Sequence, residues 1–281
     1  MKKRHITNNH LTAFGKHLIT EELSAGTIEK YLREVRQFSA WLQGASLAKD
    51  SASRWKKHLL AERYSPSTVN GKLAALNAFL HFMNWQDCRV KAIKLQRQLF
   101  RDQTRELTRQ EYRRLVETAE QSNQKRLALL METICSTGIR VSEVPYITLE
   151  AVYAGKAEVS LKGKVRTILL PSKLCHKLQK YANKNKITSG EIFLTRGGGS
   201  LGRKQIWAEM KALCIKAGIA PSKVFPHNLR HLFARCFYRV YRDIVKLADI
   251  LGHSSVNTTR IYLVSTGAEH VKALEQMKLI L

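Results

Sequence analysis

AEVSLKGKVRTILL, residues 157–170, carries the strand signal of this sequence. β-branched and aliphatic residues lie on both sides of Gly163, a pattern that predicts two short strands joined by a tight turn. Pro171 and Ser172 follow directly and predict the start of a helix. Since the other patterns along the chain are helical, the expected fold is mostly α with a small antiparallel sheet.

Helices are expected on both sides of this stretch. The clearest lies over residues 24–43, where six apolar or aromatic side chains recur at helical spacing: Ile28, Tyr31, Leu32, Val35, Phe38 and Leu42. Another begins at Ser65 and Pro66 and places apolar residues on one face. Shorter or less regular helices are expected at about 8–20, 51–62, 202–217, 227–240, 243–251 and 267–279.

Two domains are expected, a small all-helical one over residues 1–88 and a second over residues 107–281. The segment between them, residues 89–106, is rich in charges and lacks strong amphipathicity, which is typical of a linker. A capping box and the spacing of a hydrophobic staple mark the second start, at Thr108 with Glu111 and Leu107 with Tyr112.

The charge balance indicates the class of partner. The chain has 48 Lys and Arg against 22 Asp and Glu, a formal net charge of +26. This much like charge opposes the compact state unless a polyanion relieves it, so nucleic acid is the expected partner. Both halves of the chain are basic, which suits two domains that hold one DNA duplex.

The cysteines and the apolar runs indicate the compartment. The five cysteines form no Cys-x-x-Cys pair, and four of them lie in apolar stretches, so neither a disulfide framework nor a zinc site is indicated. No apolar run follows the basic N-terminus, and none approaches the ~20 residues of a membrane span. We therefore expect a soluble, cytoplasmic protein in a reducing compartment, without membrane contact.

Four short motifs combine residues that can act on a phosphate. They are residues 135–144 (CSTGIRVSEV), 161–171 (LKGKVRTILLP), 226–234 (PHNLRHLFA) and 247–263 (LADILGHSSVNTTRIYL). Taken singly, each has an ordinary structural explanation. His227 and Arg230, however, lie at i,i+3 and reach one anion from one helix face. A zinc site at His227 and His231 is disfavoured, because Arg230 repels a cation and no Glu lies between the histidines.

Together these motifs resemble the tyrosine recombinase, or phage integrase, family, especially its Xer-like and transposon-integrase members. The matching strings are Thr-Gly-Ile-Arg-Val-Ser-Glu, His-x-Leu-Arg-His and Leu-Gly-His-Ser-Ser…Thr-Thr-x-x-Tyr, in that order. The resemblance implies a two-domain DNA clamp whose catalytic residues are Arg140, Lys162, His227, Arg230, His253 and Tyr262. It also implies that Glu143 helps to order the site, whereas His231 is interpreted as structural.

Elementary chemistry gives each of these residues a role. Tyr262 is expected to attack phosphorus and to store the bond energy in a 3′-phosphotyrosyl link, so no ATP should be needed. Arg140 and Arg230 are expected to neutralise the phosphate oxygens, so neither a metal ion nor a cofactor is expected. His227 is the natural acceptor of the tyrosine proton, and His253 is better placed to bind the phosphate. At the hairpin turn, Lys162 is preferred over Lys164 as the acid that protonates the leaving 5′ oxygen.

The resemblance further implies conservative site-specific recombination by four protomers on two DNA duplexes with paired inverted-repeat sites. Residues 268–281 suit a C-terminal helix that docks into a neighbouring protomer, and packing on its own domain is the alternative. Accessory DNA-bending proteins and a place at the bacterial nucleoid are compatible with this interpretation. The alternatives are a type IB topoisomerase-like enzyme and a catalytically inactive DNA-binding regulator on the same scaffold.

Overall fold

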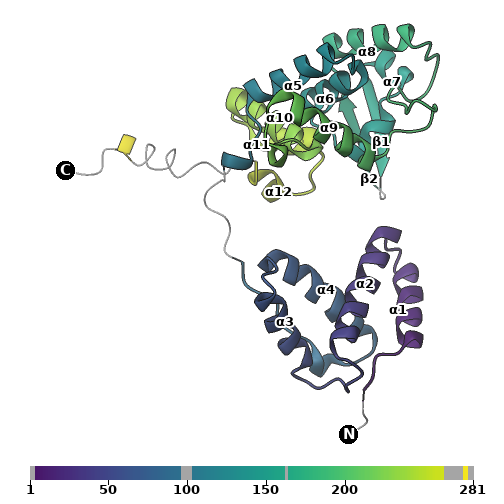
Figure 1. The fold of residues 1–281 in the computed structure, drawn as a ribbon, viewed down its shortest axis with the longest axis vertical. Helices are drawn as coiled ribbons and strands as arrows, with labels where there is room; N and C mark the ends of the chain where they lie inside the picture. The colour runs from purple at the N-terminus through teal and green to yellow at the C-terminus, as the bar shows by residue number, and fades with distance from the viewer. Residues whose placement is uncertain (1–3, 96–102, 162–163, 263–274, 278–281) are drawn as a thin grey trace. The chain divides into compact units, whose positions relative to one another are not determined.

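The computed structural model describes residues 4–95, 103–161, 164–262 and 275–277. The chain divides into two compact units, Met1–Arg97 and Gln98–Leu281 (Figure 1). Residues 96–102 of the predicted linker lie outside the described residues, as does all but 275–277 of the predicted C-terminal helix. None of the helices in these ranges is long and apolar enough to cross a membrane.

The N-terminal unit is built from α-helices, and its described residues contain no strand. The helices are α1 (Asn8–Thr20), α2 (Ala25–Trp41), α3 (Ser51–Ala61) and α4 (Pro66–Phe82), followed by a 3₁₀ turn at Gln86–Cys88. The Ser65 side chain accepts a hydrogen bond from the Thr68 amide, and Pro66 occupies the first turn of α4, so the sequence signal there is a true helix start. Phe14, Phe38 and Trp55 lie at the centre of the apolar core.

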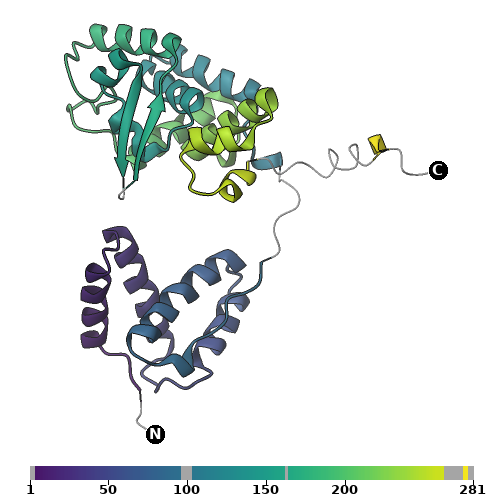
Figure 2. The ribbon, with the colours of Figure 1, turned by 180° about the vertical axis from the view of Figure 1, so that it is seen from behind.

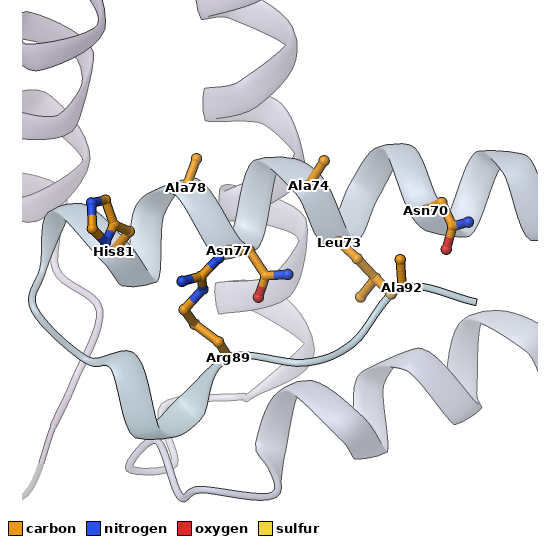
Figure 3. Close-up of a pocket in the computed structure, with 8 residues that line it drawn as sticks. All are labelled: Asn70, Leu73, Ala74, Asn77, Ala78, His81, Arg89 and Ala92. Carbon is orange, nitrogen blue, oxygen red and sulfur yellow. The ribbon is translucent and has the colours of Figure 1, made fainter. Parts of the chain in front are cut away.

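Two asparagines on α4 hold the chain that leaves this unit. The amide group of Asn77 donates to the Val90 carbonyl (2.8 Å) and accepts from the Val90 amide (3.0 Å). Asn70, seven residues earlier and on the same face, does the same with Ile93 at 2.9 and 2.8 Å. Figure 3 shows both asparagines on α4 facing the extended segment. The first part of the predicted linker therefore packs on the helical unit.

The second unit combines helices with the predicted hairpin. Strands β1 (Lys156–Leu161) and β2 (Lys164–Leu169) are antiparallel, with Lys156 opposite Leu169 and Leu161 opposite Lys164. The helices are α5 (Arg109–Gln121), α6 (Lys125–Thr137), α7 (Leu149–Ala154), α8 (Ser172–Lys184), α9 (Arg203–Ala217), α10 (Pro226–Tyr241), α11 (Ile244–Leu251) and α12 (Val256–Arg260), with 3₁₀ turns at Gln103–Arg105, Val141–Tyr146 and Pro221–Lys223. The expected fold class, mostly α with a small antiparallel sheet, is confirmed.

Two apolar clusters organise this unit. The larger unites α5, α6, α9 and one face of the hairpin around residues such as Leu130, Ile134 and Met210. The smaller contains Ala234, Leu247, Leu251 and Tyr262. Figure 2 shows the hairpin beside the yellow-green helices α11 and α12. The predicted capping box at the start of α5 is present, with Thr108 and Glu111 each accepting from the other's backbone amide.

Candidate active site

A left-handed glycine places Arg140. Helix α6 ends at Gly138, whose φ of 66° suits glycine, and an added Cβ there would lie 2.5 Å from the Phe233 ring. The chain therefore turns sharply after α6, and Arg140 caps the 3₁₀ turn Val141–Tyr146. This turn directs Arg140 into a cavity while Glu143 lies buried behind it.

A second left-handed glycine places His253. Helix α11 ends at Gly252 (φ 64°), where an added Cβ would lie 2.5 Å from the Arg166 side chain. His253 follows at once, and Ser255 then caps the short helix α12, which leads to Tyr262. Gly138 and Gly252 each end a helix in the left-handed conformation, and the contacts that an added Cβ would make show that close packing also requires glycine there.

Arg230 on α10 ties these segments together. Its side chain is only 2% exposed and donates to the carbonyl of Gly138, to the Leu251 carbonyl (2.7 Å) and to Nε2 of His253 (2.9 Å). Burial lowers the pKa of Arg230, and a hydrogen bond with the Tyr262 hydroxyl opposes that shift. One guanidinium thus joins the ends of α6 and α11 to the predicted nucleophile.

Glu143 is shared by two arginines. Its Oε2 accepts from the Arg140 amide (2.7 Å) and from Nη2 of Arg166 (2.5 Å), and its Oε1 accepts from Nη1 of Arg140 (3.0 Å). Arg140 also donates to the Gly252 carbonyl at 3.3 Å. Sequence reasoning expected Glu143 beside Arg140 but missed Arg166. The sequence did contain a sign of this role for Arg166. Side chains alternate along a strand, so Arg166 shares a face with Ile168 and Leu170, which are buried.

Three histidine rings surround the buried Tyr262. Ring centroids lie 4.4 Å away for His231, 5.8 Å for His253 and 6.2 Å for His227, and the His227 and His231 rings are 4.6 Å apart. His231, interpreted from the sequence as structural, is therefore the histidine whose ring lies nearest to the tyrosine ring. Packing of α10 against the segment after α12 produces this contact, which motif spacing does not reveal.

The hydrogen bonds of His253 define its protonation. A guanidinium only donates, so Nε2 of His253 accepts from Arg230 and the ring proton resides on Nδ1. Nδ1 then donates to the Thr259 hydroxyl, 2.8 Å away. Burial and the charges of Arg230, Arg140 and Arg166 lower the pKa of His253 to about 4. The pKa of His227 is lowered as well, by burial and then by Arg230 and Arg140. Both rings are neutral at pH 7.

The lowered pKa of His253 predicts a pH-dependent stability. The unfolded ring takes up a proton near pH 6.5, whereas the folded ring does so only near pH 4. Between these values the unfolded state binds more protons, so the free energy of unfolding should fall as the pH falls through this window. Urea unfolding at several pH values measures this, and His253→Asn should reduce the slope between pH 4 and 6.5. An unchanged slope would contradict the assignment.

A cavity of about 900 Å³ collects the predicted site residues. Arg140, His227, Arg230, His253 and Tyr262 all line it. Lys162 lies outside the described residues, and Lys164 begins β2. Three further lining residues were missed by sequence reasoning: Arg203, Lys204 and Trp207, on the first turns of α9. In the sequence, their signal was a tryptophan three and four positions after two cations at the predicted start of a helix.

Metal ligands do not gather in this cavity. Within the described ranges, no group of three or more His, Cys, Asp or Glu side chains is arranged to hold a metal ion. The pair His227 and His231 thus has no third ligand of these types there.

Comparison with known proteins identifies relatives over nearly the whole chain. Residues 105–269 match the family described as "Phage integrase family", and residues 11–87 match "Phage integrase, N-terminal SAM-like domain". The tyrosine recombinase XerA of Thermococcus kodakarensis is 31% identical over 283 residues, which cover 97% of this chain and 96% of the relative.

Solved structures share the fold. The crystal structure of a XerA recombinase, 25% identical, matches with a TM-score of 0.54 over 97% of this chain and 99% of its own. A lambda integrase tetramer bound to a Holliday junction, 18% identical, matches with a TM-score of 0.72 over 90% of this chain and 76% of its own.

Proposed function

The chain belongs to the phage integrase family, and we propose that it exchanges DNA strands between two specific sites through a 3′-phosphotyrosyl bond to Tyr262. It is a tyrosine recombinase, an enzyme that cleaves and rejoins DNA. The observation that carries the proposal is the convergence of Arg140, Arg230, His253 and Tyr262, from separate segments, on one cavity.

The proposed chemistry uses only groups of this chain. The Tyr262 oxygen forms a bond to phosphorus as the bond from phosphorus to the 5′ oxygen breaks. The tyrosine proton passes to a neutral histidine, for which we retain His227, and a lysine protonates the departing oxygen. Arg140 and Arg230 bind the non-bridging oxygens, where negative charge develops. Attack by the free 5′ hydroxyl of a second strand reverses these steps and rejoins the DNA.

The exposure and the hydrogen bonds of the two arginines support this division of roles. Arg140 is 40% exposed on the cavity side, so its guanidinium can reach a phosphate without being withdrawn from the fold. Arg230 already donates toward His253 and the tyrosine hydroxyl. A phosphate that enters the cavity would accept hydrogen bonds from Arg140 and Arg230 in place of the protein groups that accept them now. Donation from His253 to that phosphate requires its proton to reside on Nε2.

We propose an assembly of four protomers on two duplexes with paired inverted repeats. The related lambda integrase forms a tetramer on a Holliday junction, which supports this arrangement. Docking of residues 268–281 in a neighbour, a role for DNA-bending proteins and a nucleoid location are part of the same proposal. A type IB topoisomerase would instead relax supercoiled DNA without paired sites, and an inactive regulator would form no covalent adduct.

Trapping of covalent adducts tests the function. Incubation with a fragmented genomic library, followed by denaturation in SDS and sequencing of the attached DNA, should recover a short inverted-repeat site from the wild-type protein. Tyr262→Phe is the control and should recover none. Adducts spread over unrelated sequences, together with supercoil relaxation, would favour the topoisomerase. Absence of any adduct would favour the regulator.

A substrate with a changed leaving group can identify the general acid. A 5′-bridging sulfur departs as a stable thiolate and needs no proton. If Lys162 is the acid, Lys162→Ala should cleave ordinary DNA ~10²-fold more slowly or worse and be largely rescued on the sulfur substrate. Arg140→Ala should not be rescued. The same assay on Lys164→Ala separates the two lysines, since only loss of the true acid gives this pattern.

A further inference from the structure

We propose that Arg166 is a positioning residue that keeps the charge of Arg140 available to the phosphate, by supplying Glu143 with a second cation. The inference rests on the proposed function, in which Arg140 binds the scissile phosphate. Arg166 lies on β2, in the same stretch of residues 161–171 as Lys162, but the family resemblance assigns it no catalytic role. Its effect on the reaction passes through Glu143.

The contacts of Arg166 link three parts of the site. Nη2 is 2.5 Å from Oε2 of Glu143, and Nη1 donates to the Ile250 carbonyl in the last turn of α11 at 3.1 Å. The side chain is 14% exposed, and burial lowers its pKa. Gly252 leaves room for it, since a Cβ there would meet its Cδ at 2.5 Å. The absence of a side chain at Gly252 therefore makes the space that the Arg166 side chain occupies.

The charges explain why one arginine needs another. Glu143 is 2% exposed, and a buried carboxylate must be compensated by a cation. If Arg140 were its sole cation, the pair would be neutral and Arg140 would be drawn toward the carboxylate. With Arg166 present, two cations share one anion, and the group keeps a net charge of about +1 toward the cavity. Glu143 can then orient Arg140 through the backbone amide without cancelling its charge.

A matched pair of variants tests the proposal. Arg126 has the same arrangement elsewhere in the unit, with Nη2 2.5 Å from Oε1 of Glu209 and Nη1 donating to the Leu194 carbonyl. Arg126→Gln therefore removes a comparable ion pair away from the cavity. We would measure single-turnover cleavage of the site recovered by adduct trapping, with thermal unfolding of each variant. Arg166→Gln should cleave ~10²-fold more slowly, as when one donor to developing charge is lost, and Arg126→Gln should match the wild type.

Two further measurements separate positioning from a loss of folding. A methylphosphonate at the scissile position carries no net charge, so the ratio of wild-type to Arg166→Gln rates should shrink on it. Glu143→Gln added to Arg166→Gln removes the anion that needs compensation, so the double variant should be faster than Arg166→Gln alone. Equal slowing on both substrates, no gain in the double variant, or a wild-type rate for Arg166→Gln would overturn the proposal. A wild-type protein without adducts would instead overturn the proposed function, and this inference with it.

Discussion

Tyr262→Phe is expected to abolish DNA cleavage and to leave folding and DNA binding almost unchanged. The substitution removes one oxygen, the atom that would bond to phosphorus, and no other group in the cavity replaces it in the proposed mechanism. The ring stays packed against Ala234, Leu247 and Leu251, so little apolar contact is lost. Arg230 loses its hydrogen bond with the hydroxyl but keeps those with the Gly138 and Leu251 carbonyls and with His253. Removal of a nucleophile in other covalent enzymes costs on the order of 10⁴-fold or more in rate.

The measurement is formation of an SDS-resistant adduct on the recovered site, beside a binding titration of the same DNA. Tyr238→Phe is the matched control, because Tyr238 packs against the same small cluster and loses the same hydroxyl. It should form adducts at the wild-type rate. An adduct formed by Tyr262→Phe would assign the nucleophile to another tyrosine.

Arg230→Ala is expected to lose both catalysis and stability, whereas Arg140→Ala should lose mainly catalysis. Each variant loses a cation at the phosphate. By analogy with a lost oxyanion donor, this should remove ~3 kcal/mol or more of transition-state stabilisation, which slows the reaction at least ~10²-fold. Arg230 also donates hydrogen bonds to the carbonyls of Gly138 and Leu251. Its loss would leave these carbonyls without this donor, and a buried group left unsatisfied costs ~1–3 kcal/mol of stability. Arg140 is 40% exposed, and its loss should cost far less stability.

Single-turnover cleavage and thermal unfolding of the two variants measure this difference. Excess EDTA should leave wild-type cleavage unchanged, because the arginines carry the compensating charge in the proposed mechanism. A wild-type rate in Arg230→Ala, or activity that EDTA removes and Mg²⁺ restores, would show that the phosphate is stabilised by other means.

The hairpin and the helices with clear start signals were predictable because those signals are local. The capping box at Thr108 and Glu111 and the helix start at Ser65 and Pro66 depend on residues within four positions of each other. The family resemblance likewise depended on short ordered strings, which named Arg140, Arg230, His253 and Tyr262 before their geometry was known.

By itself, the sequence determined the fold class, the family and the residue types that a phosphate site needs. Only the tertiary structure decided how these residues act on one another. Arg166 meets Glu143 across 23 positions, and Arg230 meets the Gly138 carbonyl across 92. The close approach of His231 to Tyr262 also depends on such packing. Contacts of this kind are set by how helices and strands bury their apolar faces together, and no short stretch of sequence encodes that arrangement.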